Sequence, residues 1–516
     1  MMQADSHKVE RNLFALILFS ALARLAAGHW LGLGYGESYY FSLAAKPSLS
    51  YFDQPPLSLW LAAVSMKLFG AVTPLVLRLP FILLFAGSTY LIYAIGKKMF
   101  GAWPGFYAAL LLNVSAVFGV STGIFFQPES PLIFFWLTTV WCLIKLFFDP
   151  SLKNPYFYWA ATGILFGLGL LSKYPAIFLP IGAFLFLLTT PPQRGWLKHP
   201  GPYLAILISV LLFAPVLIWN AQHEWISLLW QGHRGVDYKG IHLIWLLRSI
   251  LGQAAWVLPW IWIPLIFQLY RCFKGGPALS KNWFIAWMSV VPIVVFTAIS
   301  LWTEIGYHFH WQAPGYLMLF LPLGDSLFRL LQNGSQRARR WLIGSTAFSS
   351  LALLIVVTHV ATGWGRGIEQ LFASDESKKL DDPTLEMLDY STLEEALRGR
   401  GLLARKDLFV FTNRWFQSGK VDYALKGKMP LFCFHPSDQR GFEFLRESEE
   451  WLGKDGVLVS TQKKLDNPHD AFGEYFEEII PLGFVTVPRG KYIEETLYLH
   501  YCRNYRKVFP KAYVQK

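Results

Sequence analysis

Residues 203–220 read YLAILISVLLFAPVLIWN, a stretch of eighteen positions without a charged side chain. As a helix it would be about 27 Å long, close to the ~30 Å thickness of a bilayer's hydrocarbon core. The rest of the chain has a similar composition: of 516 residues, 54% are apolar and 16% are charged, and the mean hydropathy is +0.35. A soluble domain carries about 25% charged residues. The composition therefore predicts an integral membrane protein and excludes a soluble enzyme, a disordered protein and a disulfide scaffold.

Ten further apolar runs are each about long enough to cross the membrane as a helix. They lie at 12–33, 77–96, 103–121, 129–148, 156–171, 175–190, 244–269, 283–302, 313–331 and 340–362. The sequence thus predicts an α-helical polytopic protein with eleven to thirteen transmembrane helices. The stretch 55–70 is shorter and is interrupted by Lys67, so it predicts an amphipathic helix lying along the interface.

Charge divides the chain into two predicted domains. Residues 1–362 hold 23 Lys and Arg against 10 Asp and Glu, whereas residues 363–516 hold 23 against 24. In the first part the basic residues fall in alternate loops, which the positive-inside rule assigns to the cytoplasm. The N-terminus is then cytoplasmic, and residues 363–516 form an extracytoplasmic domain. Because the basic excess lies between membrane segments, it predicts no nucleic-acid partner.

The polar domain 363–516 has the pattern of an α/β fold. Short strands are predicted at 407–412, 429–435, 456–460 and 483–487, with helices at 418–427 and 438–452. Its two cysteines, Cys433 and Cys502, could form a disulfide in an oxidising compartment. The chain contains no Walker loop and no G-x-G-x-x-G motif, so no nucleotide cofactor is expected.

Acidic residues of the membrane part gather on the predicted external side. Six of the ten fall on or next to external loops: Glu37, Asp53, Glu129, Glu224, Asp237 and Glu304. Carboxylates close to hydrocarbon are costly and usually functional, although external loops are also simply solvated. The pattern indicates that the working face is external.

Two of these acids share the first external loop. Glu37 lies in YGESYY (35–40) and Asp53 in LSYFDQPP (49–56), where Pro55 and Pro56 stiffen the chain. Two carboxylates in one loop suit a general base together with a ligand for a divalent metal or another cation. The aromatic residues also fit an interfacial belt, but such a belt does not explain the acids.

The other motifs add one acid and several cations. Glu129 lies in FQPESP (126–131), which is also an ordinary helix start, and Lys173 lies in the turn LSKYP (171–175). An ammonium there can hold a phosphate or reach toward lipid headgroups. The segment WNAQHEWISLLWQGHRGVD (219–237) offers His233 and Arg234. A histidine with a distant aspartate could hold a divalent metal, or could only be hydrogen-bonded. His308 and His310, in EIGYHFHWQAPGY (304–316), would face apart on a helix.

Taken in order, these motifs resemble the bacterial GT-C glycosyltransferases of the aminoarabinose lipid A transferase and protein mannosyltransferase-like superfamily. The matching segments are GESYY…SYFDQPPL, QPESPL, GLGLLSKYPA, APVLIWNAQHEWISLLWQGHRG and HWQAPGYL. The resemblance covers about residues 1–330. It implies inverting transfer of a sugar from a polyprenyl-phosphate donor to a lipid or glycan acceptor, such as lipid A or the lipopolysaccharide core. It also implies a cell inner membrane location with a periplasmic active face.

The resemblance also implies roles for individual residues. The catalytic Asp of the family's Asp-Glu pair falls on Gly36, so Glu37 is expected to act as the base. The metal-contacting acid falls on Asp53 and the family's phosphate-facing lysine on Gln54, which shifts donor-phosphate binding toward Lys173 and Arg234. The second acid falls on Glu129, and the metal-contacting histidine falls on His233. The reverse assignment, with Asp53 as base, also remains open.

Two other classes of function are alternatives to a glycosyltransferase: a transporter and an accessory subunit. A transporter or flippase for a lipid-linked glycan would carry charges near the membrane midplane and broken helices, and the sequence shows few such charges. A non-catalytic accessory subunit is conceivable because Gly36 replaces an acid.

The charge pattern predicts that residues 363–516 lie outside the cytoplasm. Alkaline phosphatase fused after Lys516 should be active in intact cells, because this enzyme folds only in an oxidising compartment. A green fluorescent protein fused at the same place should stay dark. The reverse result for both fusions would invert the predicted topology.

Overall fold

The computed structural model describes residues 2–303, 310–366, 382–461 and 467–513 of the chain. Contacts divide the chain into two compact units. The helical unit comprises Met1–Ala26, Gln54–Ser58 and Leu79–Ala352, and the mixed unit comprises Ala27–Asp53, Leu59–Arg78 and Leu353–Lys516. The predicted boundary after residue 362 therefore leaves out two N-terminal segments that pack with the C-terminal part.

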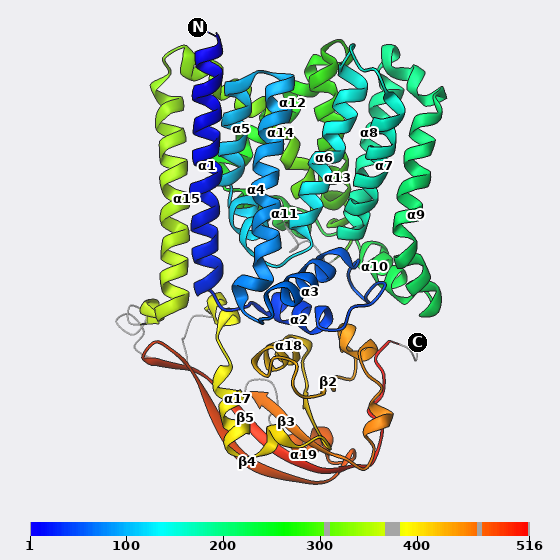
Figure 1. The fold of residues 1–516 in the computed structure, drawn as a ribbon, viewed down its shortest axis with the longest axis vertical. Coiled ribbons are helices and arrows are strands. Elements are labelled where there is room, and N and C mark those ends of the chain that lie inside the picture. The colour runs from blue at the N-terminus through cyan, green and yellow to red at the C-terminus, as the bar shows by residue number, and fades with distance from the viewer. Residues whose placement is uncertain (1, 304–309, 367–381, 462–466, 514–516) are drawn as a thin grey trace. The chain divides into compact units, whose positions relative to one another are not determined.

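All eleven apolar runs coincide with helices (Figure 1). The helices are α1 (Met2–Trp30), α4 (Pro74–Met99), α5 (Ala102–Val114), α6 (Glu129–Phe148), α7 (Pro155–Ser172), α8 (Phe178–Thr189), α9 (Pro200–Gln222), α11 (Leu243–Val257), α12 (Pro259–Gly275), α13 (Ser280–Ile299), α14 (Ala313–Gln332) and α15 (Gln336–Thr362). Helices suit a membrane because they satisfy every backbone polar group within the segment. Six stretches of the described chain are long and apolar enough to span on their own, or seven if a bent pair is one span. The chain is a multi-span membrane protein, and the total of eleven to thirteen spans stays a prediction.

The run 244–269 is not the single straight helix that was predicted. It consists of α11 and α12, which meet at an angle of 109°. Leu258 between them has φ +83°, and Pro259 follows directly. A proline has no N–H to continue the hydrogen-bond ladder and fixes its own φ, so the helix breaks at this point.

A pair of glycines brings α7 and α9 close together. Gly163 and Gly167 are four residues apart and therefore lie on the same face of α7. A Cβ added at Gly163 would lie 2.6 Å from the carbonyl oxygen of Ala205 on α9, and one at Gly167 would lie 2.9 Å from the Cβ of Leu212. Small residues allow such close approach between membrane helices, where packing replaces the hydrophobic effect.

The mixed unit contains a five-stranded sheet in the order β2-β1-β3-β5-β4. The strands are β1 (Leu408–Thr412), β2 (Leu431–Cys433), β3 (Asp455–Thr461), β4 (Phe476–Arg489) and β5 (Tyr492–Tyr505). β1 pairs in parallel with both β2 and β3, while β5 and β4 add an antiparallel hairpin at one edge. Phenylalanines of β1 and β2 form the aromatic core under the sheet, so the predicted α/β character is confirmed.

The mixed unit also contains five short helices in its described residues: α2 (Tyr35–Ala44), α3 (Leu57–Phe69), α17 (Ser391–Gly399), α18 (Trp415–Ala424) and α19 (Pro468–Phe472). α2 packs against α18, because Gly419 leaves room for the backbone of Tyr39. α18 matches the helix predicted at 418–427. The predicted helix at 438–452 was wrong, since this segment forms only two short 3-10 turns, at Arg440–Phe444 and Ser448–Trp451.

The disulfide between Cys433 and Cys502 does not form, and both thiols are buried and free. Cys433 is on β2 and Cys502 is on β5, with β1 and β3 between them. Three strand spacings amount to roughly 14 Å, whereas a disulfide requires Cα atoms within about 7 Å.

The glycine contact on α7 can be tested with a control on the same helix. Gly163→Ala should lower the thermal unfolding temperature in detergent, because the new methyl group would overlap the backbone of α9 at a cost of ~1–3 kcal/mol. Gly169→Ala should change it little, since a Cβ there would make ordinary contact at 3.6 Å. Equal effects of both substitutions would contradict close packing at Gly163.

Candidate active site

The first external motif is organised by a buried ion pair inside the mixed unit. Arg78 donates to both carboxylate oxygens of Glu37, at 2.8 and 2.5 Å, and the two side chains are 0% and 3% exposed. The same guanidinium donates to the carbonyl oxygens of Gly28, Leu31 and Gly32. Glu37 also accepts from the backbone N–H of Gly34 at the start of α2. Glu37 thus ties the end of α1 to the start of α2.

Asp53 lies in a second set of contacts in the same unit. Its Oδ1 accepts a hydrogen bond from the Tyr39 hydroxyl at 3.0 Å, and its Oδ2 lies 3.6 Å from Nη1 of Arg440. Burial and the adjacent Asp53 carboxylate raise the pKa of Tyr39, which keeps that hydroxyl protonated as a donor. Arg440 comes from the C-terminal part of the chain, and its guanidinium lies 4.7 Å from the centre of the Trp415 ring.

The helical unit contains the other half of the predicted residues. Glu129 is the first residue of α6 and Lys173 follows the last turn of α7, and their side chains form a short, nearly buried ion pair. Nε2 of His310 lies 3.2 Å from the same Glu129 oxygen. Glu129 is therefore held between two nitrogen donors.

Arg234 lies beside this group on α10 (Ile226–Val236). Its guanidinium is 4.8 Å from the ring centres of both Trp230 and Trp311. Trp311 directly follows His310, so this short segment contacts both Glu129 and Arg234. The Tyr174 hydroxyl, next to Lys173, lies 3.0 Å from Oγ of Ser227 on α10. The motifs QPESP, LSKYP, WQGHRG and HWQ therefore meet in one cluster.

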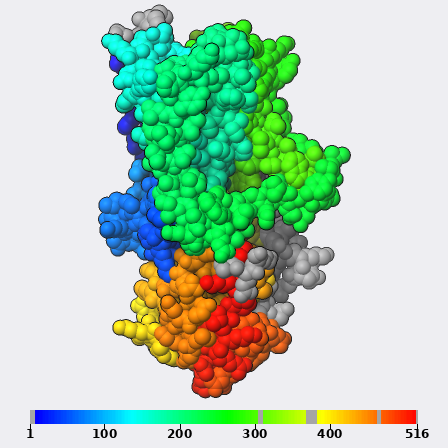
Figure 2. All heavy atoms as spheres, turned by 90° about the vertical axis from the view of Figure 1, so that its right-hand side faces the viewer, coloured from blue at the N-terminus to red at the C-terminus, as the bar shows by residue number. Residues whose placement is uncertain are grey.

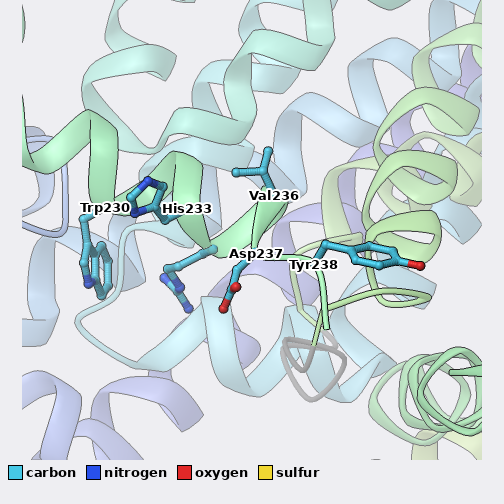
Figure 3. Close-up of a pocket in the computed structure, with 6 residues that line it drawn as sticks. Trp230, His233, Val236, Asp237 and Tyr238 are labelled. Atoms are coloured by element: carbon cyan, nitrogen blue, oxygen red, sulfur yellow. The ribbon is translucent and has the colours of Figure 1, made fainter. Parts of the chain in front are cut away.

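A cavity of about 610 Å³ opens beside Arg234 (Figure 3). Its lining residues are Trp230, His233, Arg234, Val236, Asp237 and Tyr238. A guanidinium flanked by two indoles presents its N–H groups in its own plane, which is the geometry that suits a phosphate. This part of the unit can hold an anion next to an apolar wall.

The predicted metal ligands belong to different units, Asp53 to the mixed unit and His233 to the helical unit. No three His, Cys, Asp or Glu side chains in the described ranges lie close enough together to hold an ion. His233 is exposed on α10, and the oxygens of Asp53 contact a tyrosine and an arginine. Gln54 is half-buried and uncharged. Glu304 and His308 lie outside the described residues.

Three residues of these clusters were not predicted from the sequence: Arg78, His310 and Arg440. Arg78 was visible as a charge near the start of the apolar run 77–96, which is a recognisable signal of function or ion pairing. In the sequence, His310 stands out only as part of a His-x-His pair with His308, which suggested a metal ligand and not a partner of Glu129. Arg440 carried no signal, because its neighbours in sequence are those of an ordinary polar segment.

Three comparisons with known proteins agree with this arrangement. Residues 53–219 match the dolichyl-phosphate-mannose-protein mannosyltransferase family. The chain is 22% identical to the lipid A galacturonosyltransferase RgtD of Rhizobium johnstonii over 286 residues, which are 54% of this chain and 58% of that protein. The crystal structure of ArnT from Cupriavidus metallidurans in the apo state superposes with a TM-score of 0.60 at 12% identity, covering 95% of this chain and 98% of ArnT.

The chain has the fold of ArnT. The predicted resemblance and fold class are thereby confirmed. ArnT from the same organism bound to undecaprenyl phosphate also matches, with a TM-score of 0.56 at 15% identity and 95% of this chain covered.

We expect the protein to lose stability when the buried ion pair between Glu37 and Arg78 is removed. Glu37→Gln leaves a fully buried guanidinium without its carboxylate, which should cost on the order of 3 kcal/mol. Asp237→Asn is the matched control, because the pair of Asp237 with Lys239 is more than half exposed and contributes ~1 kcal/mol or less. Thermal unfolding followed by tryptophan fluorescence should separate the two variants, and similar shifts in both would contradict a structural role for Glu37.

Proposed function

We propose that the protein is an inverting membrane glycosyltransferase. It moves a sugar from a polyprenyl-phosphate donor to an extracytoplasmic acceptor, such as lipid A, the lipopolysaccharide core or another cell-surface glycan. The observation that supports this most is the cluster of Glu129, Lys173, His310 and Arg234 in a fold shared with ArnT, whose structure has been determined with undecaprenyl phosphate.

The donor's phosphate is assigned to Lys173 and Arg234. When the bond between the sugar's anomeric carbon and the phosphate oxygen breaks, the electron pair stays on that oxygen, so negative charge develops on the departing lipid phosphate. Cations placed at this point lower the barrier because they bind the transition state better than the ground state. Glu129 holds Lys173 in position through its ion pair.

The base that takes the acceptor's proton is assigned to Asp53 in place of Glu37. Both oxygens of Glu37 accept from the Arg78 guanidinium, so proton uptake there would break a buried ion pair. Asp53 is also buried and ion-paired, but its contact with Arg440 is longer, at 3.6 Å, and involves one carboxylate oxygen, while the other oxygen accepts from the Tyr39 hydroxyl. The acceptor hydroxyl or amine attacks the anomeric carbon as Asp53 removes its proton.

A divalent metal is still proposed as a ligand of the site, but no step of the reaction is assigned to it. Asp53 and His233 are the candidates from the sequence, but the described residues supply no three-ligand group. The reaction as derived therefore uses only the side chains of this chain.

The test uses full-length protein in detergent with radiolabelled undecaprenyl-phosphate sugars and lipid A. Wild type should transfer label to lipid A, and Asp53→Asn should slow turnover by about 10²–10⁴-fold, the usual contribution of a general base. Glu478→Gln, at an exposed position paired with Arg503 on the antiparallel hairpin, should leave turnover near that of the wild type.

Two results would overturn the assignment in different ways. Full turnover by Asp53→Asn together with none by a folded Glu37→Gln would return the role of base to Glu37. Binding of the donor without transfer to lipid A or to extracted surface glycans would favour a flippase or an accessory subunit.

A further inference from the structure

The polar sheet has a second cluster of charged side chains that the proposed reaction does not use. The parallel strands β1 and β2 end at Thr412 and Cys433, and the loops that follow begin at Asn413 and Phe434. In open α/β sheets, ligands bind in the crevice outside the carboxyl ends of parallel strands. These two loops therefore mark the edge of the sheet where a ligand site is expected.

Five residues of these loops and the start of α18 are linked by a series of contacts. Nη1 of Arg414 lies 2.9 Å from Nε2 of His435, whose Nδ1 lies 2.9 Å from the backbone nitrogen of Asp438. Asp438 accepts from Nε of Arg440 at 3.0 Å, and Arg440 stacks on Trp415, the residue after Arg414. All five are half-buried, so each keeps some access to solvent.

Arg414 has unused capacity for an anion. Among the residues that the structure describes, no carboxylate lies within ion-pair distance of it, and its buried Nε has no hydrogen-bond partner. Burial and the neighbouring Arg414 guanidinium lower the pKa of His435, and an imidazole is not a counter-ion for Arg414 in either protonation state. A buried donor without a partner costs free energy unless a ligand or water satisfies it.

The start of α18 adds further donors at the same place. Arg414 is the residue before the first turn, and no side chain caps this end of the helix. Gln417, in that first turn, is 3% exposed, and neither its Nε2 nor its Oε1 has a partner. Gln417 therefore places a buried amide without a partner in the turn where backbone N–H groups and the helix dipole attract anions.

We propose that Arg414, Arg440, Gln417 and the start of α18 bind a phosphate group of the glycan acceptor. Arginine is the side chain best suited to phosphate, because its planar donors match two oxygens at once. The donor's phosphate already has Lys173 and Arg234 in the helical unit, which leaves this second site to the acceptor.

Arg440 connects this phosphate site to the assigned base. Its guanidinium contacts both Asp438 and Asp53, at 3.0 and 3.6 Å. An acceptor anchored by its phosphate at Arg414 is thereby held in the part of the mixed unit that contains Asp53. The C-terminal segment borders the same site, since the Tyr513 hydroxyl donates to Asp438. In Figure 2, red residues near the C-terminus lie against orange residues of the mixed unit. The assignment rests on the proposed function for the acceptor's identity, although binding can be measured without turnover.

The test measures binding of lipid A to full-length protein in detergent, with phosphorylated and enzymatically dephosphorylated lipid A as probes. Wild type should bind the phosphorylated form at least tenfold more tightly. Arg414→Gln should remove this difference, and Arg414→Lys, which keeps the charge, should retain part of it. Arg503→Gln is the control, because Arg503 is an exposed arginine paired with Glu478 on the antiparallel hairpin.

The same variants distinguish binding of a phosphate on the acceptor from binding of the phosphate on the donor lipid. Arg414→Gln should bind undecaprenyl phosphate as tightly as wild type does, whereas weaker binding would assign the site to the donor and overturn the proposal. Equal affinity of wild type for phosphorylated and dephosphorylated lipid A would also overturn it, whether or not any sugar is transferred. If Arg414→Gln unfolds below the assay temperature, Arg414→Lys and Gln417→Leu decide the question by the same measurement.

Discussion

The mixed unit depends on the buried ion pair between Arg78 and Glu37. An arginine without water is tolerated only when its charge and donors are satisfied. Here one carboxylate and three carbonyl oxygens at the end of α1 satisfy it. The pair sets the direction of α2, and α2 in turn packs its Tyr39 against α18. The position of Asp53, which accepts from Tyr39, follows from this chain of contacts.

The helical unit also contains buried charges, and it places them at the ends of its helices. Its polar residues lie at helix ends, where Glu129 begins α6 and Lys173 follows α7. A carboxylate at a helix start is favoured by the helix dipole, and it also offsets the ammonium beside it. The Arg234 guanidinium lies 4.8 Å from the centres of the Trp230 and Trp311 rings. Both units thus use ion pairs to hold cations where an anionic substrate would need them.

Periodic and local features were predictable, and long-range ones were not. Helices formed in all eleven apolar runs, and the strand at 407–412 appeared as β1, because hydrophobic pattern determines burial locally. The break in 244–269 was missed because Pro259 lies inside an otherwise continuous apolar run. The helix expected at 438–452 failed because aromatic packing and the contacts of Arg440 held that segment in turns. β5 was not recognised as a strand because it carries many polar residues.

For the candidate site, the sequence alone determined which residues were available: the acids Glu37, Asp53 and Glu129 and the cations Lys173 and Arg234. Their motifs could be recognised because chemistry near hydrocarbon restricts residue type at each position. Only the tertiary structure decided which of them pair. In the structure, Glu37 pairs with Arg78 and Glu129 pairs with Lys173. Asp53 pairs with Arg440, which lies 387 positions later in the chain. Ion pairing depends on distance in space, and the packing of helices and loops that creates that distance is not encoded in any local pattern.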